Sequence, residues 1–135
     1  MTASWVVQLA TEPKLLGVGV ERSAYTLELI RAGGAFTVGT VAREDRALVR
    51  KFVKPVKPED IDTAGSTLHG FPFRLSDSGV PLLEGAVGWF DCQAENEIEL
   101  GSHSLVVGRV RAAGFNRPED TPLLRMEDTR MSYGG

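Results

Sequence analysis

Two β-rich runs on either side of a short reversal constrain the fold more than any other feature. Residues 86–98 and 104–110 contain many β-branched and aromatic residues, and Leu100-Gly101-Ser102-His103 separates them. This spacing predicts an antiparallel hairpin. Fifteen glycines and seven prolines predict many turns and several short strands. Because strands and helices do not alternate regularly, the sequence favours a mainly β fold with short helices, a β-barrel with added helices, over a doubly wound parallel sheet.

The first twenty residues contain two further predicted strands, at residues 5–9 and 15–20. Gly17 and Gly19 alternate with valines in the second of them. One face of that strand is therefore nearly bare backbone, which indicates close approach by a ligand or another chain.

Two short helices are expected between the strands. The first begins at Ser23, whose hydroxyl caps it, and ends at the glycine pair 33–34, with a strand at 36–41 after it. The second spans residues 45–53, and residues 54–70 are predicted to be an irregular surface loop. A local excess of basic residues marks the second helix, which favours either an anion site or an ordinary solvated helix face. These residues are Arg43, Arg46, Arg50, Lys51, Lys54 and Lys57.

Composition excludes several classes of protein. A chain of 135 residues suits one domain, here residues 1–135, and its net charge of −3 argues against a nucleic-acid partner. The single cysteine, Cys92, rules out an internal disulfide and fits a reducing cytoplasm. Two histidines, His69 and His103, cannot form a three-histidine site, so no metal is predicted. No apolar run is long enough to span a membrane, and no secretory signal is visible.

Common catalytic motifs are missing from the sequence. The run Gly17-Val18-Gly19 lacks the third glycine of a dinucleotide fingerprint, and neither a phosphate-binding P-loop nor a G-x-S-x-G elbow occurs. Any enzyme chemistry is therefore expected to belong to a bound cofactor. Three polar stretches are candidate ligand contacts, although on local evidence alone they are more typical of a frayed terminus, a helix cap and a solvated turn, respectively. They are residues 2–5 (Thr-Ala-Ser-Trp), 23–26 (Ser-Ala-Tyr-Thr) and 101–104 (Gly-Ser-His-Ser).

The order of these stretches is similar to that of a known family. The chain resembles the flavin reductase-like family, whose fold is the FMN-binding split β-barrel. The resemblance extends over nearly the whole chain, and it implies this mainly β fold. The matching stretches are residues 2–4, 23–34, 36–38, 48–52, 81–92, 101–103, 108–110 and 122–125.

The resemblance implies roles for individual residues. Thr2, Ala3 and Ser4 would contact the isoalloxazine edge and ribityl chain of FMN, and Trp5 would stack on or crowd the flavin. His103 would lie on the nicotinamide side and is the candidate catalytic residue. The phosphate would be bound where the first helix begins and by a cation of the second helix. The residues expected there are Glu21, Ser23, Tyr25 and Thr26, with Arg50 or Lys51, and Tyr133 would close the site from the tail.

The resemblance also implies an activity and partners. We expect an NAD(P)H-dependent flavin reductase, with FMN or FAD as flavin and NADH or NADPH as co-substrate. It would be a homodimer with FMN near the subunit interface, and it would supply reduced flavin to a monooxygenase. The alternatives are an FMN-binding electron-transfer flavoprotein and a non-catalytic flavin-binding dimer. Family members carry a strand before the Thr-Ala-Ser motif, which begins here at Thr2, so we expect an open sheet edge or a natural start upstream.

Overall fold

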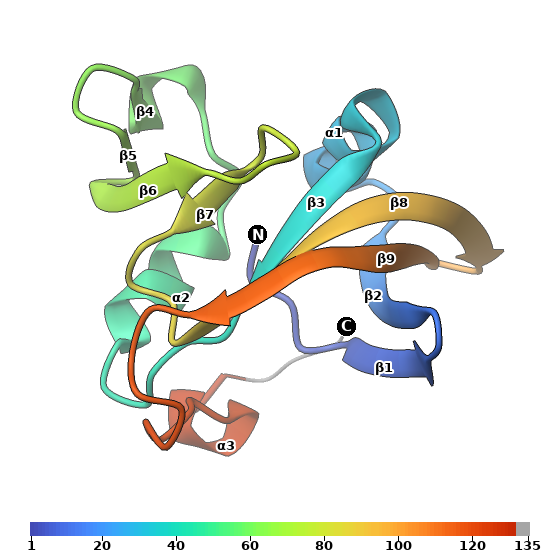
Figure 1. Ribbon diagram of the computed structural model, residues 1–135. Helices are drawn as coiled ribbons and strands as arrows, with labels where there is room; N and C mark the ends of the chain where they lie inside the picture. The colour runs from blue at the N-terminus through green and yellow to red at the C-terminus, as the bar shows by residue number, and fades with distance from the viewer. Residues whose placement is uncertain (132–135) are drawn as a thin grey trace.

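The fold is built on a five-stranded antiparallel sheet (Figure 1). The structure is a computed structural model and describes residues 1–131. The strand order β1-β2-β9-β8-β3 places the two longest strands inside the sheet, so the predicted hairpin is its centre. The strands are β1 (Val6–Thr11), β2 (Lys14–Glu21), β3 (Ala35–Gly39), β8 (Gly88–Leu100) and β9 (His103–Phe115).

The β8–β9 hairpin confirms the strongest sequence prediction. Strand β8 begins and ends two residues later than the predicted run 86–98, and β9 is longer than the predicted run 104–110. Leu100 pairs with His103 across the turn, and Gly101 adopts a left-handed φ of 59° there. The pairing continues to Gly88 and Phe115 at the far end, with two register shifts along the way. Such shifts bend a strand, and both strands curve visibly in Figure 1.

A second sheet of four short strands lies beside the first (Figure 1). The prediction of an irregular loop over residues 54–70 was wrong, because this segment contains a 3₁₀ turn, η1 (Pro58–Asp60), and two strands of the second sheet. The two sheets do not close into one continuous barrel. This arrangement agrees with the expected mainly β split barrel. The strands are β4 (Ile61–Asp62), β5 (Thr67–Leu68), β6 (Phe71–Leu75) and β7 (Pro81–Leu83).

Three short helices accompany these strands: α1 (Tyr25–Gly33) and α2 (Arg46–Phe52) lie between strands in the sequence, and α3 (Met126–Thr129) follows β9. Helix α1 ends as predicted at Gly34, which has a φ of 66°. The predicted Ser23 cap was wrong: Ala24 is the N-cap residue, and the Ser23 hydroxyl bonds to Glu21 instead. In the part of the chain that the structure describes, no helix is long and apolar enough to cross a membrane.

The core lies between α1 and the large sheet. Leu27 of α1, Val20 of β2 and Val106 of β9 are almost completely buried in it. Cys92 is also fully buried, and desolvation raises the pKa of its thiol to about 12. Cys92 is therefore a small apolar filler, as the sequence indicates.

The glycine face of β2 is covered by this chain's own side chains, which corrects the expectation that a ligand or another chain approaches it directly. A Cβ atom at Gly19 would lie 3.0 Å from the indole of Trp5. A Cβ atom at Gly17 would lie 3.0 Å from methyl groups of both Leu9 and Leu105. The two glycines thus make room for residues of the neighbouring strands.

Candidate functional site

The N-terminal segment, residues 2–5, is anchored at both ends. The Thr2 N–H donates to the carbonyl of Phe52 at 2.9 Å, and the Thr2 hydroxyl donates to the carbonyl of Val49 at 3.0 Å. Carbonyls at the end of a helix have no partner within the helix, so Thr2 satisfies the Phe52 carbonyl at the end of α2. The Val49 carbonyl accepts the Val53 N–H as well, at 3.1 Å. At the other end, the carbonyl of Trp5 accepts the Gly19 N–H at 2.8 Å.

A groove of about 600 Å³ opens beside this segment. It brings Ser4 and Trp5 together with Ser102 and His103, which lie almost a hundred residues further along the chain. Its size lies within the range of small-molecule sites, which combine mostly apolar walls with a few polar groups. The remaining lining residues are Val6, Val7, Gly19, Leu100, Ser104 and Leu105.

His103 presents a polar atom that has no partner. Its Nδ1 lies 2.9 Å from the Ser102 hydroxyl, whereas its Nε2 is buried without a hydrogen bond. The ring packs against Trp5, with 4.8 Å between the ring centroids and 52° between the planes. Buried polar atoms in folded proteins are nearly always hydrogen-bonded, so an exception needs an explanation such as a missing ligand.

The junction of β2 and α1 adjoins the same turn. Glu21 pairs with His103 in the β2–β9 register, and the Arg22 N–H donates to the carbonyl of Ser102 at 3.0 Å. The Ser23 hydroxyl donates to a Glu21 carboxylate oxygen at 3.1 Å, which holds Glu21 beside the start of α1. At that start, Tyr25 is exposed and Thr26 is half-buried. The first N–H groups of a helix have no partner within it, so this end can receive an anion.

Ala3 and Ala24 connect this junction with the N-terminal segment. Both are partly buried against the same core cluster. Of the expected flavin contacts, Thr2 therefore lies against α2, Ala3 against the core and Ser4 with Trp5 in the groove. The structure brings the residues of the N-terminal segment and of the hairpin turn together as one site.

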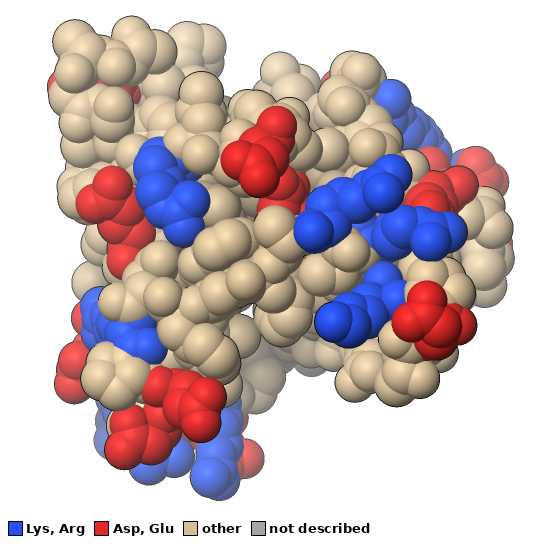
Figure 2. Space-filling model, viewed as in Figure 1, with Lys and Arg blue, Asp and Glu red and all other residues tan. Residues whose placement is uncertain are grey.

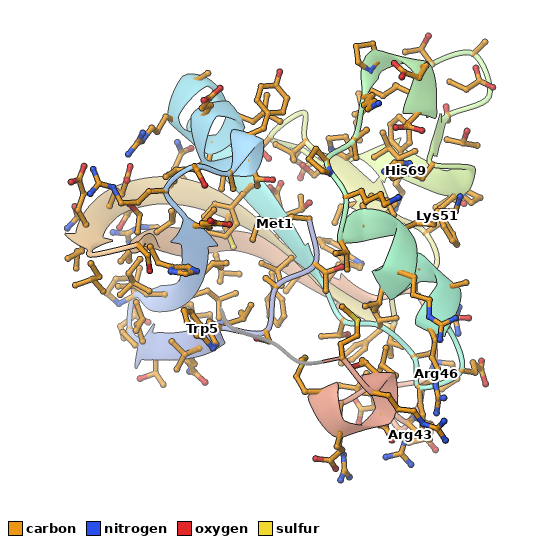
Figure 3. The ribbon with its side chains drawn as sticks, turned by 180° about the vertical axis from the view of Figure 1, so that it is seen from behind. Met1, Trp5, Arg43, Arg46, Lys51 and His69 are labelled. Carbon is orange, nitrogen blue, oxygen red and sulfur yellow. The ribbon has the colours of Figure 1, made fainter. Side chains whose placement is uncertain are left out.

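The cations of α2 lie on another side of the segment. Figure 3 shows Trp5 at the start of β1 and Lys51 on α2, with Met1 between them in that view. Arg50 and Lys51 are exposed in the last turn of α2, which carries the two carbonyls that Thr2 binds. Among the described residues, no hydrogen bond or ion pair links either cation to Ser23 or Thr26. The two parts of the expected phosphate site are therefore not joined by direct contacts.

Most other arginines are paired with carboxylates, which sets the α2 cations apart. The Arg31 guanidinium donates two hydrogen bonds to the Glu97 carboxylate, at 2.8 and 2.6 Å. Arg22 lies 3.0 Å from Glu99, and Arg109 pairs with Glu95. Figure 2 shows the resulting mixture of both charge signs at the end of the sheet where β8 and β9 meet. Within residues 1–131, by contrast, the α2 cations Arg46, Arg50 and Lys51 have no ion pair.

Glu97 was missed by sequence reasoning, although it fixes the position of the strand that carries His103. The Ser104 hydroxyl donates to the same Glu97 carboxylate oxygen that accepts a hydrogen bond from Arg31, at 2.6 Å. Hydrogen bonds from Arg31 and Ser104 lower the pKa of Glu97 from its usual 4.5 to about 2. A glutamate on a strand carries no local signal of this role, because its partners come from α1 and β9.

His69 is a second histidine with an unpartnered buried atom, and it was also missed. Its side chain is only 8% exposed; Nδ1 lies 3.2 Å from Asp60, and Nε2 has no partner. The ring meets Phe52 edge-on at a centroid distance of 5.2 Å. His69 therefore supports, through Phe52, the helix end to which Thr2 is bonded. Figure 3 shows it at that end of α2.

Two further predictions concern metals and the tail. Within the described part of the chain, no three side chains of His, Cys, Asp or Glu gather in a way that would hold a metal ion. Tyr133, expected to close the site from the tail, lies outside the described residues.

Comparisons with known proteins agree with this fold. The chain is 30% identical over 135 residues to a flavin reductase of Pseudomonas putida and spans 72% of that protein. The chain is also 32% identical to the FMN reductase (NADH) RutF of Ancylobacter novellus over 117 residues. This alignment covers 84% of the chain and 61% of the relative. The solved flavin reductase of styrene monooxygenase from Pseudomonas putida superposes with a TM-score of 0.72 at 25% identity, over 87% of this chain and 71% of that one.

A match over almost the entire sequence shows to which family the chain belongs. The sequence profile described as "Flavin reductase like domain" matches residues 1–134. The resemblance noted from the order of the motifs is thereby confirmed. The chain belongs to the flavin reductase-like domain family.

Proposed function

We propose that this protein is an NAD(P)H-dependent flavin reductase that binds FMN. The observation that carries the proposal is the groove that joins Ser4 and Trp5 to the Ser102–His103 turn. One side of this groove offers small polar residues to a flat ring, and the other offers a histidine whose Nε2 has no partner. Relatives named flavin reductase and FMN reductase (NADH) support the same function.

The residues around the groove fit FMN as a bound cofactor. Ser4 lines the groove, while Thr2 and Ala3 hold the segment that leads to it. The N-terminal end of α1 with Ser23 and Thr26 suits the phosphate, since free helix N–H groups attract anions. Arg50 or Lys51 would add the charge-assisted contact that phosphate groups favour. Neither cation is occupied by a carboxylate of the described chain. We prefer FMN to FAD because one relative is named an FMN reductase.

The protein's part in the reaction is binding and orientation. Bound FMN would supply the hydride and electron transfer between a reduced nicotinamide and an acceptor, so no protein nucleophile is required. Ser102 holds Nδ1 of His103, which leaves Nε2 to orient the nicotinamide carboxamide. Holding two reactants in the productive geometry is a large source of rate enhancement. Val6, Leu100 and Leu105 supply apolar walls to the groove, and such walls suit a flat ring.

A homodimer and a downstream partner belong to the same proposal. Strand β1 is an edge strand whose Val7 and Leu9 side chains are 51% and 43% exposed, and Leu100 of β8 is 57% exposed. Such a contiguous apolar surface marks an interface, and a second copy would cover it. One relative is named as the flavin reductase of a styrene monooxygenase, which supports delivery of reduced flavin to a monooxygenase.

Steady-state oxidation of NADH and NADPH, with and without added FMN, tests the proposal. We expect turnover that depends on free FMN and saturates with the nicotinamide. Tight FMN binding with fast reduction but no turnover of added flavin would instead assign the protein to the electron-transfer alternative. FMN binding without any nicotinamide oxidation would leave the non-catalytic dimer.

A further inference from the structure

Glu21 places a carboxylate beside the helix end where the flavin phosphate is expected. It is the last residue of β2, and it pairs with His103 in the β2–β9 register. The Ser23 hydroxyl donates to a Glu21 carboxylate oxygen at 3.1 Å. Ser23 lies two residues before Tyr25, the first residue of α1. One of the residues assigned to the phosphate is therefore already bonded to an anionic side chain of the same chain.

This junction of β2 and α1 adjoins the groove. The Arg22 N–H donates to the carbonyl of Ser102 at 3.0 Å, and Ser102 lines the groove. The N-cap residue of α1 is Ala24, which makes no side-chain cap hydrogen bond, so the first turn of the helix is not closed by a polar side chain. A phosphate bound at this end would lie beside Ser23 and its partner Glu21.

The charge of Glu21 is not paired with a cation in the described part of the chain. Arg22, the basic residue next to it in the sequence, lies 3.0 Å from Glu99 instead. The hydrogen bond from Ser23 is the interaction that holds the Glu21 carboxylate in place. A serine hydroxyl has a single proton to donate. Ser23 can therefore donate to Glu21 or to a phosphate, but it cannot donate to both.

We propose that Glu21 is a specificity-determining residue that weakens the binding of flavins that carry a phosphate. The inference rests on the proposed function and adds the residue that keeps FMN exchangeable. Glu21 engages the Ser23 hydroxyl, and its negative charge repels a phosphate held at the same helix end. Riboflavin lacks the phosphate, so its affinity does not depend on Glu21. A reductase that supplies free reduced flavin needs a loosely held flavin, because the product must leave.

Two substitutions of Glu21 separate its two effects. Glu21→Gln removes the charge and keeps an oxygen that can accept from Ser23, whereas Glu21→Ala removes both. Titrations with FMN and with riboflavin, followed by flavin fluorescence, measure the two affinities without turnover. The Kd of FMN should be about tenfold lower in Glu21→Gln, equivalent to about 1.4 kcal/mol, and lower still in Glu21→Ala, while the Kd of riboflavin stays within twofold. An unchanged Kd of FMN in both variants, or an equal gain for both flavins, would overturn the role of Glu21.

Glu28→Gln is the matched control. Glu28 is an exposed glutamate in the first turn of the same helix, and within residues 1–131 its side chain makes no hydrogen bond to Ser23. Its neutralisation should change the Kd of FMN less than threefold, because an exposed charge without contact to Ser23 acts only through screening solvent. An effect as large as that of Glu21→Gln would mean that net charge alone weakens FMN, and it would overturn the inference.

Ser23→Ala tests the competition for the hydroxyl. In the otherwise unaltered protein it should change the Kd of FMN less than twofold, because Glu21 engages that hydroxyl. In the Glu21→Ala background it should raise the Kd of FMN about fivefold, because the phosphate then accepts from Ser23. Equal effects in the two backgrounds would overturn the inference, and the reductase would stand if the unaltered protein oxidises NADH with added FMN. Failure of the unaltered protein to bind FMN would overturn both.

Discussion

Gly108→Ala is expected to destabilise the protein sharply, because Gly108 makes room for a core aromatic ring. An added Cβ would lie 2.6 Å from Cε1 of Phe36 and 3.0 Å from the Cβ of Cys92. Both neighbours are buried, so neither can retreat into solvent. Overpacking costs about 1–3 kcal/mol, and we expect the upper end, about 3 kcal/mol, because the contact with the Phe36 ring is closer than 3.0 Å. The lower backbone entropy of alanine in the unfolded chain offsets about 0.5–1 kcal/mol of this cost. The expected net loss in the free energy of unfolding is about 2 kcal/mol.

Urea unfolding and thermal melting measure this effect. A loss of about 2 kcal/mol should lower Tm by roughly 6–12 °C in a chain of this size. Gly33→Ala is the matched control, because no atom lies within 4 Å of its added Cβ and its φ is not left-handed. That substitution should raise stability by about 0.5–1 kcal/mol, the helix preference of alanine over glycine.

A double-mutant cycle identifies the clash as the cause. Phe36→Leu shortens the ring that an alanine at 108 would meet, so Gly108→Ala should cost at least 1 kcal/mol less in that background. If Gly108→Ala is as stable as the unaltered protein, or if the two substitutions simply add, the packing argument is wrong.

Three further predictions concern the site. His103→Ala should lower kcat/KM for NADH at least tenfold while the Kd of FMN stays within twofold, since the loss is one of orientation; equal losses of both would contradict the assigned role. Lys51→Ala should weaken the binding of FMN by about tenfold and leave the binding of riboflavin unchanged, because only FMN carries a phosphate for the charge-assisted contact. Titration of the variant with both ligands measures this difference, and an equal loss of affinity for both would refute the prediction. Glu97 has a pKa lowered to about 2 in the folded protein, so its stabilising effect is complete above its ordinary value of 4.5 and is lost as the pH falls toward 2. Melting from pH 6 to pH 2 should therefore show a steeper loss of Tm for the unaltered protein than for Glu97→Gln, and parallel curves would exclude this linkage.

Much of the architecture could be predicted from the sequence because its signals are local. The β8–β9 hairpin is visible in two β-rich runs and a glycine turn, and α1 ends where its glycine pair allows a left-handed residue. The prediction failed where partners are distant. Strands β4 and β5 have two residues each, which is too short for any periodicity. They are strands only because β4 pairs with β5 and β5 pairs with β6.

The site was predicted only as separate pieces. The sequence indicates the Thr-Ala-Ser segment and the Ser-His turn, but their meeting in one groove depends on the β1–β2–β9 register. The two glycines of β2 suggested a surface open to ligands, whereas Trp5, Leu9 and Leu105 fill it. His69 and Glu97 could not be identified from the sequence. His69 is buried in a fold that packs it against Phe52, and Glu97 is paired with Arg31, 66 residues away in the chain.

Anaerobic addition of NADH to the FMN-loaded protein, followed by its visible spectrum, tests the central claim most directly. If the groove beside His103 brings nicotinamide and flavin together, the yellow flavin absorption should bleach in proportion to the NADH added and return when air is admitted. A protein that binds FMN but keeps its yellow spectrum under excess NADH and NADPH would contradict the account.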